Sequence, residues 1–268
     1  MNPGRIKALT FYYLFAFKND VTRVILAICH PVFDLMIWGF TTKYIIGDQI
    51  GNKGSNYLSL VVSCFIFWNI ISKAQQETSS QFKEDIYCHN LNNLMITPLK
   101  SSEFILALLF SSLIKILLII PLLFIFSLVL FNFNLFKLNP TIIIHLLNYL
   151  IFGWSLGIGV TALTLRLGNR VDFLPIILSF LIQPFACVFY PRTTLNGIFY
   201  AISWLIPPSY GFEAMRNIIL NQNSIISPAN SANPLIAFSL SIFYFLFSLF
   251  FYELLLQNAR RKGTLIHL

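Results

Sequence analysis

The sequence is poor in charged residues. Only 10% of its 268 residues are Asp, Glu, Lys or Arg, whereas about a quarter of the residues in an average soluble domain are charged. Hydrophobic residues make up 57% of the chain, and Phe alone occurs 28 times. So few charged side chains would leave most of the surface of a soluble protein apolar. The composition therefore argues against a water-soluble globular protein and predicts a membrane protein.

Motifs for disulfides, metals and nucleotides are also missing. The four cysteines stand far apart without a C-x-x-C spacing, so neither a disulfide framework nor a zinc site is indicated. The four histidines are scattered and have no companion acid or nucleophile at a useful spacing. The sequence contains no G-x-x-x-x-G-K-[ST] motif, which a phosphate-binding loop needs. We therefore expect a non-enzymatic chain without a catalytic, metal-binding or cofactor-binding residue, and any ATP that powers it would bind to another polypeptide.

Six apolar segments are candidates for membrane-spanning helices. A span needs about 20 mostly apolar residues to cross a hydrocarbon core of about 30 Å. The fifth segment is short and contains two prolines. The expected spans are residues 24–46, 57–72, 104–130, 141–165, 173–190 and 235–256. Together they predict one all-helical transmembrane domain over residues 1–268.

The basic residues predict how these spans are oriented. If the N-terminus is cytoplasmic, twelve Lys and Arg residues lie on the inner side and five on the outer side, in agreement with the enrichment of basic residues in short cytoplasmic loops. Both termini and loop 73–103 are therefore expected in the cytoplasm, and residues 191–233 outside. The protein would be a multi-pass protein of the plasma membrane, which is the cell inner membrane in a Gram-negative source. Basic residues scattered between apolar runs do not predict a nucleic-acid partner.

Two further segments are apolar but too short to span. Residues 5–20 are expected to form an interfacial helix along the inner leaflet. Residues 198–206 are strongly apolar and end at two prolines. Because irregular backbone at membrane depth needs cover from protein or water, we expect a re-entrant or interfacial hairpin between the last two spans. The alternative is an apolar external loop.

Loop 73–103 contains a pattern typical of a short amphipathic helix. Its polar side carries Asp85, His89 and Asn92, and proline at position 98 is expected to end it. The apolar residues recur at spacings of three and four: Tyr87, Leu91, Leu94 and Met95. Such a face suits docking into a groove of a partner, or equally a position on the membrane surface.

A set of motifs runs through nearly the whole chain in a characteristic order. They are His-Pro-Val-Phe at 30–33, Ile-Gly-Asp-Gln-Ile-Gly at 46–51, His-Asn-Leu-Asn-Asn-Leu-Met-Ile-Thr-Pro-Leu at 89–99, residues 172–184, Val-Phe-Tyr at 188–190 and Pro-Pro-Ser-Tyr-Gly-Phe-Glu-Ala-Met-Arg at 207–216. Their order and the expected topology resemble those of ABC-2 type permeases, the membrane subunits of a class of ATP-driven exporters. The chain departs from that pattern where the family often has Gly-Thr-Leu-Glu, at 89–92, and Asn-Pro, at 207–208.

This resemblance implies a permease subunit that moves an amphiphilic, lipid-linked or hydrophobic substrate outward. It further implies a homodimer of permeases in membrane lipid, held to two copies of a cognate ABC ATPase subunit that bind the ATP. The residues implied in ATPase coupling are Glu84, Asp85, Tyr87, Asn90, Leu91, Leu94, Met95 and Pro98. Those implied in the external hairpin are Tyr190, Pro208, Tyr210 and Arg216.

Two ionisable residues are expected deep in the membrane. Asp34 and Lys115 lie ten and eleven residues inward from positions 24 and 104, so at about 1.5 Å per residue both reach about 15–17 Å. Equal depth and opposite charge predict an ion pair, with a water-lined path as the alternative. Gly153 and Gly157 form a GxxxG spacing, which serves either a dimer seam or packing within the chain.

Two other functions remain open at this point. An ion-coupled secondary transporter usually shows internal repeats and interrupted spans, and no internal similarity is visible here. An intramembrane enzyme would need its scattered histidines to meet in space. A stably bound ATPase would separate the exporter from both alternatives.

Overall fold

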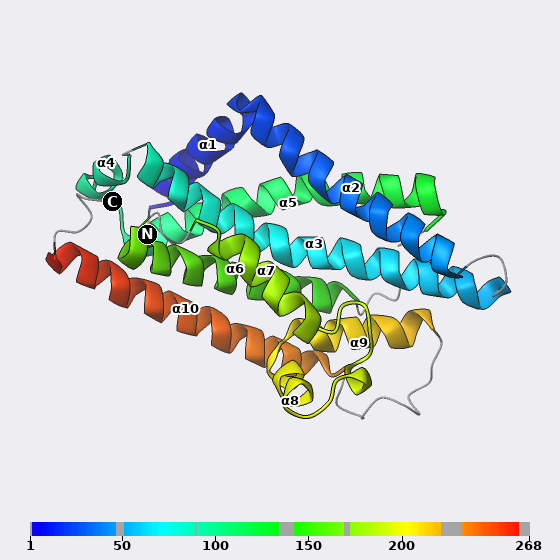
Figure 1. Ribbon diagram of the computed structural model, residues 1–268. Helices are drawn as coiled ribbons and strands as arrows, with labels where there is room; N and C mark the ends of the chain where they lie inside the picture. Colours follow the sequence, from blue (N-terminus) through cyan, green and yellow to red (C-terminus); the bar gives the residue numbers. More distant parts are fainter. Residues whose placement is uncertain are drawn as a thin grey trace.

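The computed structural model describes residues 2–46, 51–88, 90–133, 142–168, 172–220 and 232–262, and within these ranges the chain is helical and contains no strand (Figure 1). In the described part, five helices are long and apolar enough to cross a membrane. They are α2 (Val21–Ile46), α3 (Gly51–Tyr87), α5 (Ser101–Phe131), α6 (Ile142–Leu167) and α10 (Pro234–Lys262). The prediction of an all-helical protein is confirmed for the described residues, and the five long apolar helices agree with a multi-pass membrane protein.

The remaining helices are short. They are α1 (Pro3–Asn19), α4 (Leu91–Ile96), α7 (Leu174–Phe185), the 3₁₀ turn η4 (Arg192–Thr194), α8 (Ile198–Leu205) and α9 (Pro208–Ile219). The expected fifth span, 173–190, corresponds to α7, whose 12 residues extend only about 18 Å at about 1.5 Å per residue. α1 covers the segment expected to be an interfacial helix. α8 ends just before the two prolines predicted to stop the apolar run, and α9 begins at the second of them.

The largest difference from the sequence-based prediction concerns α3. The second span was expected to end at residue 72 and a polar loop to follow, but the helix continues without a break to Tyr87. Hydropathy missed the last four turns because many of their polar side chains are not solvated. Gln75, for example, is 1% exposed and donates from Nε2 to the carbonyl oxygen of Pro175 at 2.8 Å. Polar residues in this stretch therefore connect helices instead of forming a surface loop.

α3 is the central element of the bundle (Figure 1). It packs against α2, α5 and α6, and α10 packs along the outer side of α6. α1 turns away from α2 at Asp20 and lies against α5. The first half of α3 contacts α9, so α8 and α9 lie at the end of the bundle away from α1 and α4 (Figure 1).

The two glycines of the GxxxG spacing bring α6 into direct contact with α3. A Cβ atom added at Gly153 would lie 2.7 Å from the backbone oxygen of Ile71, and one added at Gly157 would lie 2.9 Å from that of Gln75. A contact this close between backbones has no room for a methyl group. The glycine pair therefore packs within the chain, which was one of the two uses that its spacing allowed.

This contact predicts a position-specific effect of adding one methyl group to α6. Gly153→Ala and Gly157→Ala should each destabilise the purified protein by about 1–3 kcal/mol, because the helices must separate. Gly159→Ala is the matched control, since a Cβ atom added there would meet nothing within 4 Å and Ala favours a helix over Gly by about 0.5–1 kcal/mol. Thermal unfolding in detergent measures all three variants. Equal melting temperatures would contradict a backbone contact.

Candidate functional site

Four segments meet at the end of the bundle that carries the start of α1 and the end of α10 (Figure 1). They are α1, the last turn of α3, α4 and the first turn of α5. This is where the sequence places the residues expected to couple the chain to an ATPase. Polar contacts between distant parts of the chain hold the four segments together.

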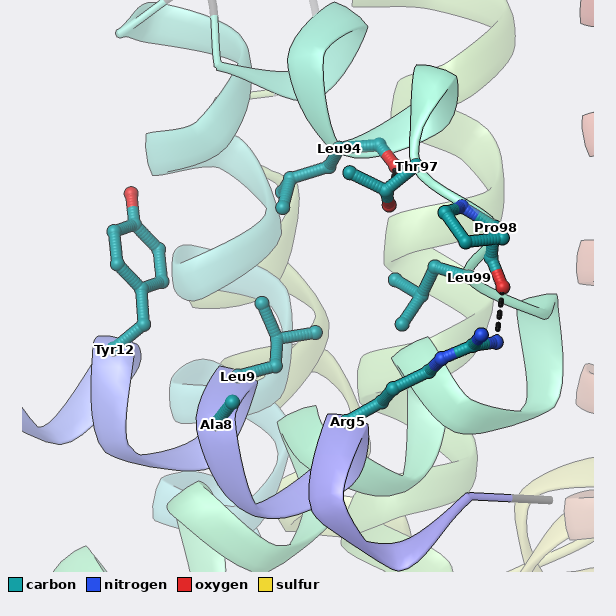
Figure 2. A pocket seen from close by; sticks show the side chains of 8 residues that line it. All are labelled: Arg5, Ala8, Leu9, Tyr12, Leu94, Thr97, Pro98 and Leu99. Carbon is teal, nitrogen blue, oxygen red and sulfur yellow. Dashed lines mark hydrogen bonds between the residues drawn. The ribbon is translucent and has the colours of Figure 1, made fainter.

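The start of α1 is attached to both sides of the α4–α5 junction. The backbone N–H of Asn2 donates to Glu103 Oε1 at 2.7 Å, and Glu103 Oε2 accepts the backbone N–H of Lys100 at 3.2 Å. Arg5 donates from Nη1 to the carbonyl oxygen of Pro98 (Figure 2). Pro98 and the segment after α4 are therefore fixed to α1.

Asp85 is the buried centre of a second connection, between α1 and α3. Its Oδ2 accepts the hydroxyl of Tyr13 at 2.5 Å, and its Oδ1 lies 3.3 Å from Nδ2 of Asn90 and 3.4 Å from the hydroxyl of Tyr12. Asp85 itself is fully buried. Burial, and secondarily the nearby Asp85 carboxyl, raise the pKa of Tyr13 well above its ordinary value, so Tyr13 remains a neutral donor. The Asp85 carboxyl group thus accepts a short hydrogen bond from Tyr13 of α1 and a longer one from Asn90, the residue before α4.

The neighbouring coupling residues also have partners inside the chain. Glu84 forms an ion pair with Arg23 of α2 at 2.5 Å. The hydroxyl of Tyr87 donates to Asp172, whose backbone oxygen accepts Nζ of Lys83 at 2.8 Å. The last turn of α3 is therefore tied to α2 and to the segment before α7.

The continuous amphipathic helix predicted around residues 85–96 is wrong. Tyr87 belongs to the end of α3, whereas Leu94 belongs to α4, a separate helix of six residues. The predicted end of that helix at residues 97–98 is confirmed, because α4 ends at Ile96. His89 and the side chains of Leu91, Asn92 and Met95 lie outside the described part of the structure.

Leu94 faces the protein. A pocket of about 410 Å³ separates α1 from the α4–α5 junction, and Leu94 points into it opposite Leu9 (Figure 2). The full lining is Arg5, Ala8, Leu9, Tyr12, Leu94, Thr97, Pro98 and Leu99. Among the described apolar side chains of α4, the outward-facing one is instead Ile96, which is 84% exposed. Periodicity missed Ile96 because it lies off the stripe that Tyr87, Leu91 and Leu94 would share on one helix.

The residues predicted for the hairpin lie at the other end of the bundle, where three of them bond to different partners. The hydroxyl of Tyr190 donates to the carbonyl oxygen of Pro184 at 2.7 Å, and that of Tyr210 to Trp204 at 2.9 Å. Arg216 donates from Nη2 to the carbonyl oxygen of Cys187 at 3.1 Å. Pro208 is the first residue of α9 and is buried. These bonds join α8, α9 and the segment after α7.

Arg192 is a residue of this cluster that the sequence did not single out. It is only 1% exposed, and its guanidinium carbon lies 4.0 Å from the ring centre of Trp204 and 4.7 Å from that of Tyr210. Its backbone N–H donates to Glu213 Oε1 at 2.6 Å. The sequence analysis used Arg192 only as one of the five basic residues expected on the outer side. The neighbouring residues in the sequence do not indicate that an arginine in a loop will be buried.

The expected ion pair between Asp34 and Lys115 is not formed. Lys115, 2% exposed, pairs with Glu77 of α3 at 3.0 Å, and the ring of Phe17 covers its Nζ at 4.6 Å. Asp34 lies 3.0 Å from Nδ1 of His30 on its own helix. The prediction used only the depth of Asp34 and Lys115 in the membrane. Depth does not determine in which direction each side chain points around its helix, and so it did not determine the partner. Glu77 was also assigned to a loop, and so it was not considered as a partner.

The comparisons with known proteins add no family. No protein-family model matches the chain, and no curated protein matches it significantly. Among the described residues, no group of three or more His, Cys, Asp or Glu side chains could hold a metal ion. In the described part of the chain, the candidate site is a junction of four helical segments held together by polar contacts.

The bond between Tyr13 and Asp85 predicts a difference between two adjacent tyrosines. Tyr13→Phe removes the short donor of a buried carboxyl group and should destabilise the protein by about 1–3 kcal/mol. Tyr12→Phe deletes the same atom from a ring that is 41% exposed, and should change stability by no more than about 0.5 kcal/mol. Chemical denaturation of both variants in detergent measures the difference. Similar losses would refute Asp85 as the centre of the junction.

The observed pair of Lys115 also has a specific test. Lys115→Met leaves Glu77 buried without its cation and should destabilise the protein by about 3–5 kcal/mol. Adding Glu77→Gln to Lys115→Met should recover at least about 1 kcal/mol, because the stranded charge is removed. Adding Asp34→Asn instead should recover nothing. Recovery with Asp34→Asn in the same unfolding measurement would restore the pairing expected from depth.

Proposed function

We propose that the chain is the permease subunit of an ABC-2 type ATP-driven exporter. In this proposal two copies span the plasma membrane, and a separate ATPase subunit binds beneath each of them. The substrate is amphiphilic, lipid-linked or hydrophobic, and it moves outward. Both termini are cytoplasmic, α1 lies along the inner leaflet, and α7 with the α8–α9 hairpin completes the outer half of the bundle.

The observation that carries this proposal is the junction of α1, α3, α4 and α5. α4 is short, lies outside the bundle of long helices and presents Ile96 to the surroundings. Its flanks are nevertheless firmly attached, through Pro98 to α1 and through Asn90 to the buried Asp85 of α3. An apolar side chain on a short, well-anchored helix is suited to a groove of a partner, because the anchor is already ordered before binding.

The same contacts provide a route for movement. A force on α4 reaches α5 directly through the capping contacts at Glu103 and reaches α3 through Asp85. Because α3 is packed against α2, α5 and α6, a displacement of its last turn would shift these three helices as well. The junction is therefore suited to transmit the closing of an ATPase pair to the membrane helices.

The test compares two exposed isoleucines at opposite ends of the bundle. Ile96→Asp should reduce the amount of ATPase that copurifies with the tagged full-length chain at least about fivefold, because loss of an interface anchor typically costs more than about 1 kcal/mol. Ile45→Asp is the matched control. Ile45 is 75% exposed at the end of α2, at the opposite end of the bundle. Mass spectrometry and ATP hydrolysis of the purified samples measure the partner.

Three outcomes would count against the proposal. If the wild-type chain purifies without any ATPase, the exporter is wrong. If Ile45→Asp loses the ATPase and Ile96→Asp keeps it, the orientation of the bundle is reversed. If both variants keep the wild-type amount, α4 is not the docking helix.

A further inference from the structure

Two buried arginines and one buried carboxylate lie close together where α9 meets the segment after α7. Arg192, Arg216 and Glu213 are 1%, 5% and 4% exposed. Glu213 Oε1 accepts the backbone N–H of Arg192 at 2.6 Å and lies 3.3 Å from Nη1 of Arg216. Within the described residues no other carboxylate forms an ion pair with either guanidinium group. The cluster thus buries one more positive charge than negative charge.

The guanidinium group of Arg192 also has unused donors. Its Nη2 donates to the hydroxyl oxygen of Ser209 at 2.5 Å. Its Nε and Nη1 are buried, and no atom of the described chain accepts a hydrogen bond from either. The rings of Trp204 and Tyr210 stabilise the charge by stacking, but a ring face does not replace an in-plane acceptor for these N–H groups. A buried charge with unsatisfied donors is unfavourable, and an anionic acceptor would satisfy the donors and also balance the charge.

We propose that this cluster binds a phosphate group, with Arg192 supplying the free N–H groups. A guanidinium group combines a permanent positive charge with several N–H donors, which suits the oxygens of a phosphate group, and one phosphate would balance the excess charge. Trp204 is partly exposed and covers the guanidinium group of Arg192. In this proposal the ring of Trp204 moves aside when phosphate binds. The inference does not depend on the exporter, because it concerns binding by this chain alone.

The surroundings favour a phosphate group carried by a lipid over free phosphate. α8 presents three large apolar side chains to the exterior, Ile198, Phe199 and Leu205, which are 71%, 52% and 57% exposed. They lie on the same helix as Trp204, beside the arginine cluster. A phosphate bound at Arg192 would therefore place attached acyl chains close to an apolar helix face, whereas a free ion would gain nothing from that face.

The experiment uses the full-length chain in dodecyl maltoside, a detergent without phosphate. Dioleoyl phosphatidic acid, dioleoylglycerol and inorganic phosphate are each titrated at constant ionic strength. Thermal unfolding and tryptophan fluorescence are recorded. Phosphatidic acid should raise the melting temperature by several degrees and change the fluorescence as Trp204 moves, and dioleoylglycerol should do neither. An effect of inorganic phosphate at the same concentration would identify a free-ion site and refute the lipid source.

Variants separate a binding site from a merely structural cluster. Arg192→Leu should weaken the response to phosphatidic acid at least tenfold, whereas Arg166→Leu, at an exposed arginine, should not. Glu213→Gln provides the decisive test if Arg192→Leu fails to fold. It keeps an oxygen acceptor for the backbone N–H of Arg192 but removes the negative charge that competes with phosphate. Its response to phosphatidic acid should therefore be stronger than that of the wild type.

A structural role alone predicts a different pattern. The Glu213→Gln protein would then be less stable to the same extent with and without phosphatidic acid. Such a result, or a response of the wild type to dioleoylglycerol equal to that to phosphatidic acid, would overturn the proposal.

Discussion

The polar side chains in the second half of α3 constrain the arrangement of the other helices. In a membrane, lipid tails solvate an apolar helix face as well as another helix does, so apolar packing alone selects neighbours weakly. Buried polar groups select them strongly, because each unpaired group is costly. Successive turns of α3 bond to different elements: Gln75 to α7, Glu77 and Gln81 to α5, Glu84 to α2 and Asp85 to α1. Moving any of these helices would break a bond that water cannot easily replace.

This constraint explains which parts of the fold could be predicted from the sequence. Long apolar runs reveal helices directly, and α2, α5, α6 and α10 begin and end within six residues of their expected positions. The second half of α3 could not be found in this way, because its polar residues look the same in a loop as in a helix that bonds to its neighbours. The partner of each residue depends on tertiary structure. Lys115 was correctly identified as a buried cation that needs a partner, but Glu77 became available only once α3 was known to continue.

The two candidate sites differ in what local sequence could reveal. The end of α4 followed from the effect of Pro98 on the residue before it, which is a local rule. The break between α3 and α4 was hidden by a periodicity that continues across it, and so Leu94 was assigned to an outward face that it does not occupy. For Arg192 the sequence carried no misleading pattern, but it carried no signal of the contacts either. Its two aromatic partners follow it at 12 and 18 residues along the chain, a separation at which sequence carries no signal of contact.

The backbone contact at Gly153 and Gly157 limits how the bundle can change shape. Helices that touch through long side chains can slide, because rotamers absorb a displacement of an ångström or more. At Gly153 and Gly157 no long side chain lies between α3 and α6 that could absorb a displacement. We therefore expect these two helices to move together as one rigid unit. A conformational cycle in this protein would therefore place its hinges elsewhere, for example at the bend at Asp20, where α1 ends and α2 begins.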